Sequence, residues 1–428
     1  MKIETRAYTN FEVATIEKDT PVVSILLTAD CFSENTPHQV AVSMIYTDLL
    51  LSGAGQYSRD EFIYAINELG ANISVSENEG RITIAVKTLA VNLKKTLNLL
   101  ELMLKTPTFS VDESKRAIET TENALVLYKD DSRALAHDAL SRTIYKKIDR
   151  HFSFTPEELI LEIKSVTTSE IQSLHDQFMN THWIFSVGGN TKAIRESLNL
   201  IEKLKKLRLA IAPVLPMSAQ ETLKGRKLVL QSVNSKQNID LSIGAPLPLT
   251  ISDVDFPAFN FGLAVLGKWG GFAGRLMSTV REKEGLTYGI YAKTEEVTKT
   301  TTGYWRIMTF FAPKDTVKGV NSTLREIKKI HDDGITESEL QRFKNILKTG
   351  EVLVYDSLAG TVGFVHGTML SGIGFVEYKK YRERLYTCTR KEVNQALKKY
   401  LDPNQLIISA AGPVDKVAKE LKNIVKSQ

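Results

Sequence analysis

Hydrophobic and polar positions follow two different periods in the first quarter of the chain, and each period predicts one kind of element. In the segment RITIAVKTL, Ile82, Ile84 and Val86 alternate with more polar positions, which is typical of a strand with one buried face. The segment that follows repeats leucine on one helical face, at Leu93, Leu97, Leu100 and Leu104. Ser110 then stands where a helix N-cap is expected, so a second, more polar helix is predicted after it.

The same order of elements returns in the second half of the chain. YWRIMTFFAP predicts a strand, and DDGITESELQRFKNIL predicts a later helix that Thr336 is placed to cap. Between them, apolar residues share one helix face: Val317, Val320, Leu324 and Ile327. Phe109 and Ile335 occupy matching places, so the sequence repeats at an offset of about 226 residues.

The repeat extends upstream, where a helix, a glycine turn and a strand precede this pattern in both halves. Ser58 and Glu61 form a capping-box pair at the start of the first of these helices, and Gly70 stands where it stops. Gly285 stands where the matching helix of the second half stops. The internal repeat therefore covers most of each half.

The fold class expected from this pattern is α+β, with two homologous, duplicated halves that face each other and enclose a cavity. Residues 1–209 would form the N-terminal half and residues 226–428 the C-terminal half. The linker is expected at residues 210–225, where Pro213 and Pro216 interrupt a segment without a clear period. A cavity between the halves is a suitable place for a substrate.

Composition narrows the functional classes. The chain has 428 residues, 43% hydrophobic and 25% charged, with a net charge of only +5. The basic residues are not concentrated among aromatic residues, so nucleic-acid binding is not expected. Cys31 and Cys388 are far apart, which argues against a disulfide framework or a thiolate zinc site. No apolar run has the length of a membrane span, and the first residues lack the apolar region of a signal peptide.

The sequence offers few patterns of catalytic chemistry. None of its seven histidines has another histidine four positions away, so both H-E-x-x-H and H-x-x-E-H are missing. The glycines of GKWGGFAG loosely suggest a phosphate loop, but no Gly-Lys-Ser/Thr supports it, and a loop that opens a helix explains them. A hydrolase with some other active site is therefore the weakest functional interpretation.

One stretch, GRLMSTVREKEGLTYGIYAK, combines residue types that suit peptide binding. Arg281 is expected near the end of a helix and Tyr288 at the start of the next strand, with Gly285 turning the chain between them. Both side chains could then face one cavity, where they would hold a peptide carbonyl or stabilise the oxyanion that forms when water attacks it. A structural salt bridge and a core tyrosine are the alternative explanation.

Five segments together resemble the pitrilysin/insulinase metallopeptidases, and among them the group that includes the subunits of mitochondrial processing peptidase. They occur in the family's order over nearly the whole chain: LLLSGAGQYSRDEFIYAINELGANIS, FSVDESKRAIETTENALVLYKDDS, VTTSEIQSLHDQFMNTHWIFSVGGN, GGFAGRLMSTVREKEGLTYGIY and CTRKEVNQALKKYLDPNQLIISAAGP. The resemblance implies two α/β-sandwich halves of the processing-peptidase type.

In this family an H-x-x-E-H motif on a helix of the first half holds zinc, a few residues before a glycine. Counting back from Gly53, the motif positions fall on Met44, Thr47 and Asp48, and the segment reads MIYTD. Both histidines and the catalytic glutamate are absent, so the resemblance implies that this chain binds no zinc itself. The helix would survive as scaffold, with Met44 and its neighbours packed in a core.

Of the other family motifs, the arginine–tyrosine pair is intact, and the third zinc ligand cannot be aligned securely. The substrate-holding arginine and tyrosine of the second half fall on Arg281 and Tyr288. The third zinc ligand comes from the helix near residues 113–129, where Glu119 and Glu122 are present but do not align securely. One carboxylate would not hold zinc by itself.

The combination resembles a known division of labour between two subunits. A homologous subunit with H-x-x-E-H would supply zinc, and this chain would supply Arg281 and Tyr288 to hold an extended peptide. Gly270 and Gly271 lie in a loop that could contact the substrate. The alternative is a pseudo-peptidase that acts as a binding or scaffold protein, and a homodimer of the chain alone stays open. Exported bacterial pairs of this type favour a periplasmic location, with a cytoplasmic one as the alternative.

Overall fold

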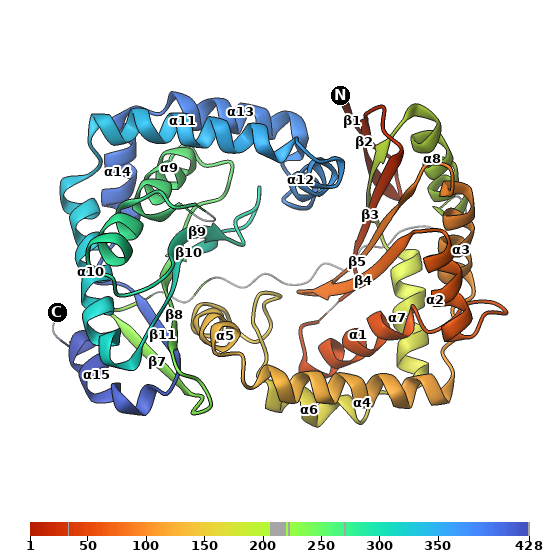
Figure 1. Ribbon diagram of the computed structural model, residues 1–428, viewed down its shortest axis with the longest axis horizontal. Coiled ribbons are helices and arrows are strands. Elements are labelled where there is room, and N and C mark those ends of the chain that lie inside the picture. Colours follow the sequence, from red (N-terminus) through yellow and green to blue (C-terminus); the bar gives the residue numbers. More distant parts are fainter. Residues whose placement is uncertain (33, 206–219, 221–222, 269–270, 427–428) are drawn as a thin grey trace.

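The computed structural model describes residues 1–32, 34–205, 220, 223–268 and 271–426, and it shows two halves that face each other (Figure 1). Each half is built on one sheet. The N-terminal sheet contains β1 (Lys2–Ala7), β2 (Phe11–Glu17), β3 (Val22–Asp30), β4 (Asn72–Asn78), β5 (Arg81–Leu89) and β6 (Trp183–Gly189). The C-terminal sheet contains β7 (Lys227–Ser232), β8 (Ile239–Leu247), β9 (Ile290–Glu295), β10 (Gly303–Phe311) and β11 (Ile407–Gly412).

The two sheets share one topology. In the N-terminal sheet β2 pairs parallel with β6, and β3, β5 and β4 follow in antiparallel order. In the C-terminal sheet β7 pairs parallel with β11, and β8, β10 and β9 follow in antiparallel order. The first sheet adds β1 as an antiparallel edge strand beside β2. This repeated order confirms the predicted α+β class with two duplicated halves.

Helices complete each half. Those of the N-terminal half are α1 (Pro37–Leu49), α2 (Arg59–Glu68), α3 (Leu93–Lys105), α4 (Val111–Tyr128), α5 (Ser132–Ile144), α6 (Pro156–Ile163), α7 (Thr168–Asn180) and α8 (Thr191–Lys205). Those of the C-terminal half are α9 (Phe256–Gly267), α10 (Thr316–Asp333), α11 (Glu337–Val354), α12 (Leu358–Leu370), α13 (Gly374–Thr387), α14 (Arg390–Tyr400) and α15 (Ala418–Lys426). Met277–Lys283 is a π-helical segment, and two short 3₁₀ turns span Pro313–Asp315 and Val414–Lys416.

Local sequence explains where the repeated helices begin. Ser110 accepts a hydrogen bond from the backbone N–H of Glu113 at the start of α4, and Thr336 accepts one from Glu339 at the start of α11. Each bond satisfies a backbone donor that the first helical turn would otherwise leave without a partner. Both predicted N-caps are confirmed.

The hydrophobic periods of the sequence correspond to buried faces. The alternating residues of β5 and the leucine face of α3 lie in the N-terminal core: Ile82, Ile84, Val86, Leu93, Leu97, Leu100 and Leu104. In the C-terminal core Val320, Leu324 and Ile327 of α10 are buried as predicted, whereas Val317, in the first turn, is only partly buried. Each sheet is therefore held by the elements that the periodicity predicts.

Each half also lends one helix to the sheet of the other half. Helix α5 packs on β7, β8 and β11, and its Leu140 and Ile144 lie in the C-terminal core. Helix α12 packs on β2, β3 and β6, and its Val362 and Val365 are buried with residues of the N-terminal sheet (Figure 1). Because α5 and α12 are equivalent by the repeat, the exchange is mutual. The two halves complete each other's packing.

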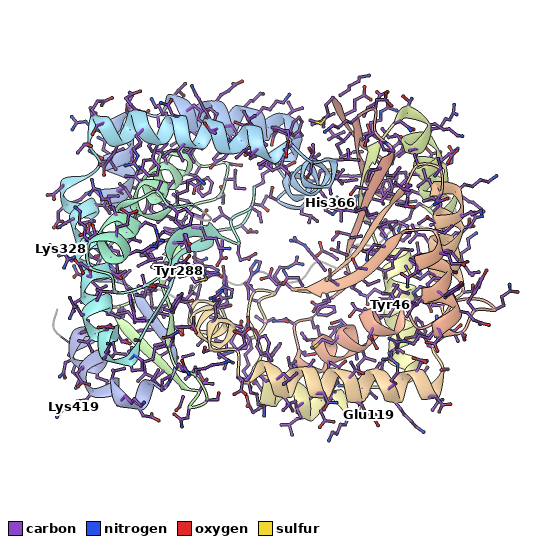
Figure 2. The ribbon with its side chains drawn as sticks, in the orientation of Figure 1. Tyr46, Glu119, Tyr288, Lys328, His366 and Lys419 are labelled. Atoms are coloured by element: carbon purple, nitrogen blue, oxygen red, sulfur yellow. The ribbon has the colours of Figure 1, made fainter. Side chains whose placement is uncertain are left out.

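His366 fixes α12 to the N-terminal sheet (Figure 2). Its Nε2 lies 2.8 Å from Oγ1 of Thr28 on β3, and its Nδ1 lies 2.9 Å from Oγ of Ser186 on β6. Burial lowers the pKa of His366 to about 4. The ring is therefore neutral at physiological pH and joins the two halves by hydrogen bonds to hydroxyl groups.

Most of the linker predicted at residues 210–225 lies outside the described residues. Within it, Leu223 packs into the C-terminal core, and Gln220 donates a hydrogen bond to the backbone carbonyl of Gly303. Among the described helices, none is by itself long and apolar enough to cross a membrane. Helices α12 and α13 together have the length and composition of a membrane span, but the axis of one is bent by 93° from that of the other. Helix α12 is also packed between the two halves.

Candidate functional site

Helix α1 is held in place by its start and by one buried face. Thr36 caps the helix by accepting a hydrogen bond from the backbone N–H of Gln39, and Pro37 occupies the first turn, where no N–H donor is needed. On the opposite side from solvent, Ile45, Tyr46 and Leu49 are fully buried. These contacts set the direction of the remaining side chains of the helix.

Tyr46 has a polar partner inside this core (Figure 2). Nε2 of His175 lies 3.1 Å from the carbonyl oxygen of Leu104, which can only accept, so Nε2 carries the proton. The other ring nitrogen, Nδ1, then accepts the hydroxyl proton of Tyr46 at 3.0 Å. Both ring nitrogens of His175 are thus engaged in hydrogen bonds inside the core, which is a structural role.

The three positions on which the H-x-x-E-H motif would fall, Met44, Thr47 and Asp48, carry other interactions here. Met44 is partly buried and packs against the N-terminal core, as predicted. Thr47 donates its hydroxyl proton to the carbonyl oxygen of Met44 at 2.9 Å. Asp48 Oδ2 accepts from Nη2 of Arg116 at 2.7 Å. A thioether and a hydroxyl are poor zinc ligands, and the guanidinium of Arg116 already supplies a positive charge at the remaining carboxylate.

Helix α4 supplies no third ligand at this place. Met44 lines a cavity of about 450 Å³, and the residues of α4 on the same cavity wall are Leu125 and Tyr128. Glu119 is exposed on the outer side of α4 (Figure 2), and Glu122 lies 2.9 Å from Nζ of Lys164. Neither candidate lines the cavity: Glu119 is exposed, and Glu122 forms an ion pair with Lys164.

The structure brings Arg281 and Tyr288 together, as the sequence predicts. The guanidinium carbon of Arg281 lies 5.2 Å from the ring centroid of Tyr288 and 4.9 Å from that of Phe272. Contacts of this kind between a guanidinium and an aromatic face are attractive. Tyr288 is 74% exposed and Phe272 is 67% exposed. The three side chains form an exposed aromatic–arginine cluster in the C-terminal half, with no core tyrosine among them.

Two local details differ from the sequence prediction. Arg281 does lie near a helix end, but the segment is a π-helix, Met277–Lys283, and Gly285 turns the chain after it with a φ of 63°. Tyr288 does not start the next strand, because β9 begins at Ile290. Tyr288 therefore belongs to the connecting loop, and this position explains its exposure.

The glycine loop before this helix is described only in part. Gly270 lies outside the described residues. A side chain at Gly271 would meet only ordinary contacts with Lys268, whereas Gly274 has a φ of 120° and lies against the backbone of Gly267. Gly274 is therefore the glycine that this turn requires. Phe272, which sequence reasoning missed, follows directly after the Gly-Gly pair, and that exposed aromatic position is the only indication of it in the sequence.

Two sequence families match this chain. Residues 12–153 match the insulinase family, peptidase family M16, and residues 167–347 match the peptidase M16 inactive domain. A curated relative, the non-peptidase homolog YmxG of Helicobacter pylori, is 20% identical over 379 residues, which cover 86% of this chain and 84% of the relative.

Solved structures share the whole fold. A peptidase M16 inactive domain from Pseudomonas fluorescens is 18% identical and has a TM-score of 0.81, over 96% of this chain and 98% of that one. A protease from Helicobacter pylori is 14% identical and also has a TM-score of 0.81, over 96% and 99% of the two chains. At these sequence identities the similarity establishes the fold alone. Any inference about chemistry has to come from the residues described above.

Proposed function

The chain is an M16-family member that lacks the zinc motif, and we propose that it is the substrate-binding, non-catalytic subunit of a two-chain zinc peptidase. The observation that carries the proposal is a contrast between two sites. The zinc-motif positions Met44, Thr47 and Asp48 are filled by packing and an ion pair. Arg281 and Tyr288 are instead exposed side by side, and no described residue forms an ion pair with Arg281.

The exposed aromatic–arginine cluster suits recognition of a peptide carbonyl. The guanidinium of Arg281 and the hydroxyl of Tyr288 are donors that can reach an oxygen on which negative charge develops. Contact with the rings of Phe272 and Tyr288 limits the rotamers of Arg281, so less freedom is lost when substrate binds. A partner subunit with H-x-x-E-H would supply the zinc-bound water and the general base.

Reconstitution with a homologous zinc-motif subunit tests this proposal. The mixture should hydrolyse an extended peptide that neither chain hydrolyses alone. Arg281→Ala and Tyr288→Phe should each lower kcat/KM by about 10²-fold, the usual effect of removing one donor to a developing oxyanion. Suitable control variants are Arg390→Ala and Tyr64→Phe, because both residues are exposed and lie on other helices.

The controls should retain full activity and all four variants should keep the circular dichroism spectrum of the parent. Full activity of both Arg281→Ala and Tyr288→Phe would exclude the assigned role. A stable complex without hydrolysis would favour the scaffold interpretation instead, in which the chain only binds its partner.

A further inference from the structure

Three side chains that are distant in sequence meet at the junction of the two halves. Glu79 lies in the turn between β4 and β5, His151 lies in the loop after α5, and Glu296 directly follows β9. Their nearest ligand atoms all lie within 4.8 Å of one another. One imidazole and two carboxylates from three separate segments therefore converge on a single point.

His151 is the buried centre of this cluster. Its side chain is only 3% exposed, and Nδ1 lies 2.9 Å from Oε2 of Glu79 and 3.3 Å from Oε2 of Glu296. Neither ring nitrogen makes a hydrogen bond of acceptable geometry with any described residue. A buried polar atom without such a bond carries a large desolvation cost, so a partner for the ring is expected at this point.

The two glutamates occupy equivalent and strained places in the repeat. Glu79 has a φ of 54° and Glu296 a φ of 57°, and they are the two residues other than glycine with positive φ in the described part of the chain. Glycine or asparagine would adopt this conformation at lower cost. A glutamate at both places suggests that the carboxylates themselves are needed there.

The arginine and lysine side chains near the cluster form ion pairs with other carboxylates. Arg150 and Arg81 both donate to Oδ1 of Asp30, and Arg150 reaches only the backbone carbonyl of Glu79. On the other side, Arg306 and Lys293 pair with Glu295. Among the described residues, the protonated ring of His151 is the cationic partner of Glu79 and Glu296, and a bound metal ion would take the place of that proton.

We propose that Glu79, His151 and Glu296 bind one divalent transition-metal ion of the zinc class and thereby join the two halves. Zinc bonds of about 2.0–2.1 Å to nitrogen and oxygen place neighbouring ligands about 3.3 Å apart in a tetrahedron, close to the distances from Nδ1 to the two carboxylates. An ion with a charge of +2 would also balance two carboxylates and a neutral imidazole. Glu79 and His151 line the cavity of about 450 Å³, so water can complete the coordination.

This site shares no residue with the lost zinc motif, although Met44 borders the same cavity, and it does not depend on the proposed function. Its ligands come from both halves, whereas Met44, Thr47 and Asp48 all lie on α1. Mg²⁺ and Ca²⁺ prefer sites made of oxygen ligands alone, so the imidazole favours a transition metal.

Calorimetric titration of the full-length chain, stripped of metal with EDTA, tests the assignment. One equivalent of Zn²⁺ should bind, and an excess of Mg²⁺ should not displace it. Glu79→Gln and Glu296→Gln should each weaken Zn²⁺ binding by about tenfold or more, because each removes one ligand and keeps the side-chain shape. Both side chains are partly exposed, so neither change should prevent folding.

Glu77→Gln provides a matched control in the same hairpin. Glu77 lines the same cavity, but its Oε1 accepts from the backbone N–H of Gly80, and it is not part of the cluster. This variant should change Zn²⁺ affinity by less than about threefold if ligation matters more than general negative charge. The assignment is wrong if no equivalent of Zn²⁺ binds, if Glu79→Gln and Glu296→Gln bind as the parent does, or if all three variants weaken binding equally.

Discussion

Acid should destabilise the folded chain through His366. The unfolded chain protonates this histidine with an ordinary pKa of about 6.5, whereas the buried ring has a pKa of about 4. Between these two values the unfolded state binds more protons, so stability falls as the pH is lowered from about 6.5 to 4. Above about 6.5 the contribution of the neutral ring is fully present. A difference of about 2.5 pKa units corresponds to a loss of about 3 kcal/mol.

Urea unfolding of the parent and of His366→Gln at pH 7 and pH 4.5 measures this loss. Glutamine can still hydrogen-bond to Thr28 and Ser186, but it does not titrate. Other groups titrate in both proteins, so the difference between the proteins isolates the histidine. The free energy of unfolding of the parent should fall by about 2 to 3 kcal/mol more than that of the variant.

His38→Gln is a control with the opposite sign. The hydrogen bond to Glu170, together with Glu162, raises the pKa of His38, and the two carboxylates lie 2.8 and 3.0 Å from its ring nitrogens. Its contribution is present below the unfolded pKa and is lost as the pH rises through the folded pKa. An identical pH dependence of the parent and His366→Gln would refute the reasoning, because α12 would then not depend on a neutral ring.

Two further pairs of variants test packing and backbone conformation by urea unfolding. Leu140→Ala should lower the free energy of unfolding by about 2 to 5 kcal/mol, because this residue of α5 is fully buried in the C-terminal core. Leu127→Ala, at an exposed position, should change it by less than about 0.5 kcal/mol. Equal effects of the two variants would contradict the helix exchange. Gly274→Ala should cost about 1 to 3 kcal/mol because its Cβ would lie 2.8 Å from Cα of Gly267 at a φ of 120°. Gly350→Ala, in α11 with open space around its Cβ, should gain about 0.5 to 1 kcal/mol, and a loss there would count against this account.

Much of the fold could be predicted because its causes are local. The period of 2 in RITIAVKTL, the leucine spacing of α3 and the caps Ser110 and Thr336 depend on neighbours within a few residues. The duplication follows because the same local causes recur at a fixed offset. These signals establish the elements of each half, but they do not determine which half a helix covers.

The exchange of α5 and α12 could not be predicted for that reason. Both helices have a buried apolar face, and periodicity does not show whether the face meets the sheet of its own half or the other sheet. The cluster of Glu79, His151 and Glu296 was even less predictable from the sequence. Glu79, His151 and Glu296 are far apart in sequence and follow no ligand spacing, so only the folded chain shows that they meet.

The surroundings of α1 show how the fold can be kept without the zinc motif. Along this helix the fully buried positions Ile45, Tyr46 and Leu49 belong to the N-terminal core, whereas the motif positions Met44, Thr47 and Asp48 are only partly buried. Substitution at these partly buried positions creates no large buried cavity, and Met44 already borders an existing one. The ion pair of Asp48 with Arg116 supplies the positive charge that a metal would supply elsewhere. The motif positions and the core positions therefore lie on different faces of one helix, so the motif residues can differ while the core packing is kept.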